Sequence, residues 1–190
     1  MKINRNIKFM ILVTSVGIAY ALLSTTLNVT VESVTQSAMT WDIKFTGTPS
    51  VSAGGTSATG RSCGTATIDT GSLGVTVAAT TLSKPADKCV YTLQIKNNGS
   101  VPAKLGSIGF TGPNEEPSCT SDGAQKVCGN ITYTMATNNT GTSLLAVNST
   151  LAVNETKTVY LIMEYTGTEL NTSSAVTHTG SKFTLGYVQQ

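Results

Sequence analysis

The sequence predicts an all-β protein, a two-sheet antiparallel sandwich of the jelly-roll or immunoglobulin-like kind, with about eight strands, preceded by an N-terminal apolar helix. Three observations support this class. Apolar and polar side chains alternate in short runs throughout the chain after residue 21, as they do in half-buried strands. Thr, Ser, Asn and Gly are abundant and only 12% of the residues are charged, which favours strands and turns. No amphipathic helical pattern separates the alternating runs.

The first 21 residues have the features of a secretory signal. MKINRNIK contains three basic residues and precedes about fifteen apolar ones, after which Ala19 and Ala21 flank Tyr20. A basic segment, a short apolar segment and an A-x-A site predict export and cleavage after Ala21. The alternative is that residues 9–23 stay in the membrane as an uncleaved anchor.

Residues 22–31 form the first predicted strand, directly behind the cleavage site. A strand at a free chain end can complete its own domain or pair with another molecule. Residues 22–40 are therefore predicted to be a strand and a tether, ahead of a domain at 41–190. One face of this strand carries Leu23, Thr25, Leu27, Val29 and Val31, and the other face is polar.

Seven further alternating runs fit a single domain. They cover 41–45, 72–78, 90–96, 101–108, 130–136, 158–165 and 182–190. The residues expected to face inward are Trp41, Ile43, Phe45, Leu73, Val75, Val77, Tyr91, Leu93, Ile95, Ile131, Tyr133, Met135, Val159, Leu161, Met163, Tyr165, Phe183, Leu185 and Tyr187.

The connections between these runs are rich in turn residues. Asn97-Asn98-Gly99 predicts a turn between two strands. The Gly-, Ser- and Pro-containing stretches 46–62 and 111–129 are expected to be long surface loops.

The four cysteines, Cys63, Cys89, Cys119 and Cys128, all lie in the exported part. Cysteines in an exported chain usually form disulfides, and four of them allow three pairings. The short polar spacer favours Cys119 with Cys128, which leaves Cys63 for Cys89. A metal site is the alternative, but the sequence contains neither a CxxC nor a CxxH spacing.

Charge and motifs argue against nucleic-acid binding and catalysis. Three of the 12 basic residues precede residue 9, so the exported part has nine basic and ten acidic residues and a net charge of −1. The single histidine, His178, lies in a Ser/Thr-rich stretch and is expected to be a solvated loop residue. Glu115 and Glu116 are adjacent, so an extended backbone would point them apart. We expect no enzyme, no cofactor and no metal site.

Four segments resemble a known family: GIAYALLSTTLNVT, CVYTLQIKNNGSVPAKL, STLAVNETKTVYLIMEY and FTLGYVQ. They look like the TasA and camelysin family, proteins that Gram-positive bacteria export through a SipW-type signal peptidase and that include biofilm-fibre subunits. The resemblance covers most of the chain. The four cysteines depart from the family's pattern, and camelysin's association with proteolysis has no matching metal ligands here.

The resemblance implies a structural subunit of extracellular or cell-surface biofilm-matrix fibres. Subunits in such fibres associate head to tail by donor-strand complementation, in which the mature N-terminal strand of one subunit inserts into a groove of the next. The expected partners are thus copies of the chain itself and, during export, the signal peptidase. Ala19, Tyr20 and Ala21 match the processing site, and Leu23, Leu27, Val29 and Val31 match the inserting face.

Two other functions fit the same sequence. The first strand could complete its own sandwich, which would make the protein a monomeric or membrane-tethered surface module. Alternatively, the chain is an adhesin that binds carbohydrate or protein through the stapled 111–129 loop, since recognition commonly lies in loops held by a rigid scaffold.

Overall fold

Every regular element in the described part of the chain is a β-strand. The computed structural model describes residues 39–55, 61–115, 119–167 and 176–190, and within them no helix could cross a membrane. The predicted all-β class is confirmed. The strands are β1 (Ile43–Gly54), β2 (Ala66–Ile68), β3 (Val75–Val77), β4 (Thr80–Leu82), β5 (Lys88–Asn97), β6 (Ala103–Thr111), β7 (Thr120–Asp122), β8 (Gln125–Cys128), β9 (Ile131–Ala136), β10 (Thr150–Leu151), β11 (Thr156–Tyr165), β12 (Val176–His178) and β13 (Lys182–Gln189).

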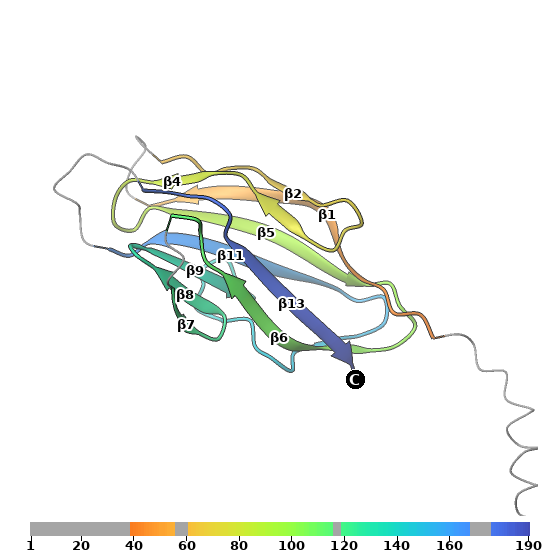
Figure 1. Cartoon of the computed structure of the whole chain (residues 1–190). Helices are drawn as coiled ribbons and strands as arrows, with labels where there is room; N and C mark the ends of the chain where they lie inside the picture. Colours follow the sequence, from red (N-terminus) through yellow and green to blue (C-terminus); the bar gives the residue numbers. More distant parts are fainter. Residues whose placement is uncertain (1–38, 56–60, 116–118, 168–175) are drawn as a thin grey trace, which may run out of the picture. The chain divides into compact units, whose positions relative to one another are not determined.

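The strands form several antiparallel sheets (Figure 1). The largest has six strands in the order β1-β5-β11-β9-β8-β7, and a second has three in the order β10-β6-β13. Two small pairs, β12 with β4 and β2 with β3, complete the set. Among the described residues β1 is therefore an end strand of the large sheet, and β13 is an end strand of the three-stranded sheet.

One hydrophobic core draws on both larger sheets. The large sheet contributes the fully buried Tyr91 and Tyr133 on β5 and β9, and the three-stranded sheet contributes Leu105 on β6. Phe183 and Leu185 on β13 are half-buried against the same core. Figure 1 shows β6 and β13 drawn across the large sheet. Residues Thr40–Gln190 accordingly form one compact unit.

The predicted turn at Asn97-Asn98-Gly99 joins β5 to the chain leading into β6. The buried Asn97 side chain donates to Val101 O at 2.8 Å and to Leu151 O at 3.2 Å, and it accepts from Gly99 N–H at 2.9 Å. A Cβ on Gly99 would come within 2.5 Å of Thr40 O, so this turn requires glycine. The side-chain amide of Asn97 thus ties this turn to Leu151 of β10.

The prediction of two long surface loops, at 46–62 and 111–129, is wrong in large part. β1 runs through 46–54, because β5 pairs with it from Ser50 to Gly54 after a bulge that begins at Thr46, and pairing with a neighbour overrides weak strand propensity. Within 111–129, β7 and β8 form a hairpin in which Asp122 pairs with Gln125 around Gly123. The two turn residues are Gly123 and Ala124, and Gly123 has a φ of 48°; a glycine at the first position of a two-residue turn is a hairpin signal. The hairpin extends the large sheet.

The inward faces expected from alternation are largely confirmed. Tyr91, Leu93 and Ile95 are buried on β5, and the predicted residues of β9 and β11 are buried or packed on the core. Trp41 and Leu73 are exceptions, with exposed fractions of 47% and 76%. Both residues precede their strands rather than lying within them. Strand pairing therefore does not orient their side chains toward the core.

Candidate functional site

An apolar groove lies between the start of β1 and the end of β13. It has a volume of about 160 Å³. This space, called the apolar groove below, is lined by Trp41, Ile43, Lys44, Phe45, Ser72, Leu73, Ile95, Leu185 and Tyr187.

Two end strands from different sheets form the two sides of the groove. Ile43 and Phe45 come from β1, and Leu185 and Tyr187 come from β13. Period-2 alternation turns each of these pairs to one face of its strand. All four side chains pack on the core without being fully buried. The groove is therefore a place where the core is open to the surface.

The chain entering β1 is fixed at the groove's side. Thr40 N–H donates to Ser100 Oγ at 2.9 Å, and Thr40 O accepts from Ser100 N–H at 2.9 Å. Two residues later, Asp42 O accepts from Asn98 N–H at 2.8 Å. These bonds hold the residues around Trp41 against the turn that follows β5. The half-exposed Trp41 ring is thus presented on the groove by a fixed backbone.

The groove carries almost no charge. Its one ionic side chain, Lys44, pairs with Asp42 at 2.9 Å. Burial raises the pKa of the Tyr187 phenol, and the carboxylate of Glu155 adds to this effect, so the phenol stays neutral at physiological pH. A groove lined mainly by aromatic and aliphatic residues, whose one cation is paired, can accept apolar side chains.

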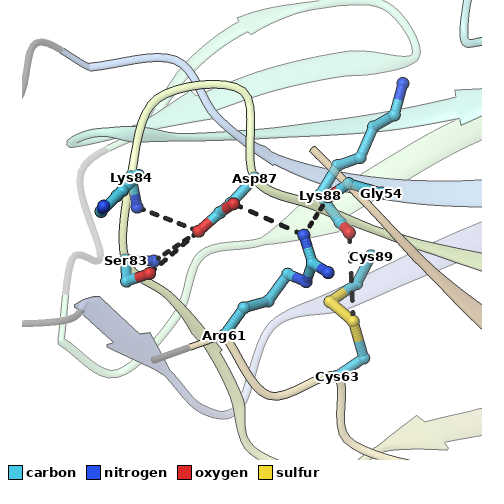
Figure 2. A network of polar contacts seen from close by, with 8 residues as sticks. All are labelled: Gly54, Arg61, Cys63, Ser83, Lys84, Asp87, Lys88 and Cys89. Atoms are coloured by element: carbon cyan, nitrogen blue, oxygen red, sulfur yellow. Dashed lines mark hydrogen bonds and ion pairs between the residues drawn. A yellow bond between two sulfur atoms is a disulfide. The ribbon is translucent and has the colours of Figure 1, made fainter. Parts of the chain in front are cut away.

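A buried carboxylate organises the opposite end of β1 (Figure 2). Asp87 is fully buried and accepts from Ser83 Oγ at 2.9 Å and from the N–H groups of Ser83 and Lys84 at 3.2 and 3.0 Å. Arg61 lies 3.5 Å from the carboxylate and donates to Gly54 O at 2.6 Å. This network ties the end of β1 to the turn before β5, because its charges are paired and bonded.

The described part of the chain contains two disulfides. Cys63 pairs with Cys89, next to the Asp87 network in Figure 2, and Cys119 pairs with Cys128 across the β7–β8 hairpin. This is the pairing that the sequence spacing favours, and the described part of the chain contains no unpaired cysteine. Two disulfides indicate an oxidising environment outside the cytoplasm.

A second polar cluster is inside the core. His178, expected to be a solvated loop residue, is instead 6% exposed on β12, so that expectation is wrong. Its Nδ1 is hydrogen-bonded to Tyr133 Oη at 2.7 Å, and Ser181 Oγ donates to the same phenol at 2.9 Å. Burial raises the pKa of Tyr133 to about 12. The Tyr133 phenol thus contacts both the imidazole of His178 and the hydroxyl of Ser181.

The loop carboxylate beside this cluster has its own partner. Glu115 accepts from Thr179 N–H at 2.8 Å and from Thr179 Oγ1 at 2.6 Å, and these bonds lower its pKa. The described residues contain no group of three or more potential ligands that could hold a metal ion.

The residues predicted to be processed and donated lie outside the described part of the chain. These are the cleavage-site residues Ala19, Tyr20 and Ala21 and the apolar face Leu23, Leu27, Val29 and Val31. The predicted anchor at 9–23 also lies there. The sequence predicts the groove's strands but not the groove, which depends on which strands end each sheet.

No protein family, curated protein or solved structure matches this chain.

Proposed function

We propose that this protein is an exported structural subunit of extracellular biofilm-matrix fibres, built on a two-sheet β-sandwich of the TasA and camelysin kind. Residues 22–31 of one copy, freed by cleavage after Ala21, insert into the apolar groove of the next copy. The observation that carries this proposal is the groove itself. It opens the core between two end strands, and a strand with one apolar face fills such an opening.

Assembly of this kind is head to tail. The donated strand precedes Thr40, whereas the groove lies between β1 and β13 of the body, so donor and acceptor are different surfaces of the same chain. Contacts between two different surfaces propagate into filaments when the rotation does not close a ring. The two disulfides support a subunit that works outside the cell, where few cellular factors assist refolding.

Substitutions on the two faces of the donated strand test the proposal. In the full chain recovered after export, Leu27→Asp places a charge on the apolar face, and Asn28→Asp places the same charge on the polar face. Burial of one leucine is worth roughly 1.5–3 kcal/mol. We therefore expect Leu27→Asp to raise the concentration needed for assembly by roughly a hundredfold, and Asn28→Asp to leave it nearly unchanged.

Sedimentation of the two variants separates the alternatives. Equal sedimentation at every concentration would contradict strand donation. A monomeric protein whose melting temperature falls only in Leu27→Asp would show instead that the strand completes its own domain.

A further inference from the structure

We infer that the open edge of β13, meaning the edge not paired with β6, is the hydrogen-bonding acceptor for residues 22–31 of a second copy, and that β1 on the other side of the groove is not. This inference rests on the proposed function and specifies its acceptor. Two observations carry it: the backbone direction of Tyr187 and the state of the β1 edge.

The backbone of Tyr187 points away from β6. Tyr187 stands opposite Leu105 in the β13–β6 ladder. Leu105 N–H, however, donates to Ser149 O at 2.9 Å, and Leu105 O accepts from Asn148 N–H at 2.7 Å, both on the β10 side. Opposite residues in an antiparallel ladder either exchange both bonds or both point outward. The N–H and C=O of Tyr187 therefore face the open edge, beside the apolar groove.

Gln189 and Gln190 continue this alternation of backbone direction. Gln190 N–H donates to Pro102 O at 3.1 Å, so the backbone at Gln190 faces β6. Gln189, one residue earlier, must then face outward like Tyr187. No strand pairs with this edge among the described residues. The end of β13 thus presents donors and acceptors at the two-residue spacing that an added strand uses.

The edge of β1 beside the apolar groove, by contrast, is already partly occupied. Phe45 N–H already donates to Ser72 O at 2.8 Å. The pairing register of β1 then shifts between Thr46 and Ser50, where Gly47 has a φ of 71°. A bulge bends its strand and interrupts the ladder, and an N–H group that already donates to Ser72 cannot donate to an added strand.

The β13–β6 ladder also shifts register, between Gly186 and Tyr187, but the residue left without a partner there is Gly106 on β6. The alternation of backbone direction along β13 itself is therefore kept, and an added strand finds its donors and acceptors on β13 rather than on β1.

β13 is long enough to pair with most of residues 22–31, and the 12-residue β1 would be too, so length permits the pairing without choosing the edge. β13 has 8 residues, or about 26 Å at roughly 3.3 Å per residue, and residues 22–31 would extend over about 33 Å. Leu185 and Tyr187 line the groove. A strand paired with β13 would place its apolar face beside these side chains.

Hydrogen exchange of the full chain recovered after export tests the acceptor without any substitution. Amides in the peptide 182–190 and in the peptide 40–46 are compared below and above the assembly concentration. We expect exchange in 182–190 to slow by about tenfold or more on assembly, because outward amides gain partners, and exchange in 40–46 to change little.

A pair of variants at Tyr187 isolates the backbone donor. Tyr187→Pro removes the N–H that faces the open edge and leaves the bonds to β6 in place, whereas Tyr187→Ala removes the same ring but keeps the N–H. We expect the proline variant to need a protein concentration about tenfold higher than the alanine variant. Equal assembly of the two variants would overturn the inference.

The other outcomes are distinguishable. Filaments in which 182–190 stays unprotected would overturn β13 as acceptor and leave the proposed function standing. Protection of 182–190 at every concentration, without filaments, would mean that the strand of the same chain fills the groove, which overturns both the second copy as donor and the proposed function.

Discussion

Tyr133 Oη and His178 Nδ1 are hydrogen-bonded at 2.7 Å inside the core, although the two residues are 45 positions apart in the sequence. Because Ser181 Oγ also donates to this phenol, the phenolic proton is available to the imidazole. The phenol is 1% exposed. Its ionisation would place a charge in the core, which raises the pKa of Tyr133 to about 12.

This burial predicts a loss of stability in alkali. An unfolded tyrosine ionises near pH 10, about two pH units below the folded Tyr133. The stabilising effect of the neutral phenol is thus complete below pH 10 and is lost as the pH rises toward 12. We expect the free energy of unfolding to fall by about 1–3 kcal/mol over this range.

Denaturant titrations at several pH values from 8 upward measure this slope. Tyr133→Phe is the control, because it removes the titrating group, although its stability at pH 8 falls through the lost hydrogen bonds. A slope in Tyr133→Phe as steep as in the unchanged protein would assign the alkaline loss to other groups, such as Tyr91, whose pKa is also raised by burial.

The two disulfides should contribute different amounts to the free energy of unfolding. Cys63–Cys89 spans a sequence separation of 26 and Cys119–Cys128 one of 9. A longer closed loop removes more entropy from the unfolded chain, which gives about 3.5 kcal/mol for the first and about 2.6 kcal/mol for the second. We expect Cys63→Ala with Cys89→Ala to lower the stability more than the corresponding pair at Cys119 and Cys128, as thermal unfolding would show. The reverse order would mean that strain or residual structure outweighs loop entropy.

Asp87→Asn should be the more damaging of two matched substitutions. The amide would leave Arg61 without its charged partner, and its NH₂ group would face either the Arg61 guanidinium or the N–H groups of Ser83 and Lys84. Breaking a buried ion pair costs about 3–5 kcal/mol. Asp69→Asn is the control, because the carboxylate of the exposed Asp69 accepts only from Thr76 Oγ1 among the described side-chain contacts. We expect a change below about 0.5 kcal/mol there. If denaturant titrations showed a similar loss in the free energy of unfolding for both variants, the buried carboxylate of Asp87 would have no special role.

Trp41 should report on the occupation of the groove. It is the single tryptophan of the chain and is 47% exposed at the groove. An inserted strand would cover the indole and shift its fluorescence to shorter wavelength, because the ring would leave water. We expect this shift to accompany assembly and to be absent in Leu27→Asp. A spectrum that does not change while filaments form would place the donated strand elsewhere.

The strands of the body could be predicted from the sequence because alternation is a local signal. Tyr91, Leu93 and Ile95 are buried as their spacing predicts. The β7–β8 hairpin was missed because its polar composition is typical of a loop, and its only turn signal is the single glycine Gly123. His178 was missed for a different reason, since its burial depends on a phenol contributed by another strand.

The groove could not be predicted because it is a property of sheet order. Trp41 and Leu185 look alike in the sequence, as apolar members of short alternating runs. Only the finding that β1 ends one sheet and β13 ends another shows that the space between them is open. The cleavage site and the strand at 22–31 stay predictions, because they lie outside the described residues.

Electron microscopy of the exported protein over a range of concentrations tests the central claim most directly. The full chain is expressed and exported, its new N-terminus is determined, and negatively stained samples are compared from dilute to concentrated solution. The account predicts a chain that begins at Leu22 and thin, regular filaments above a threshold concentration. Single particles of uniform size at every concentration would contradict it.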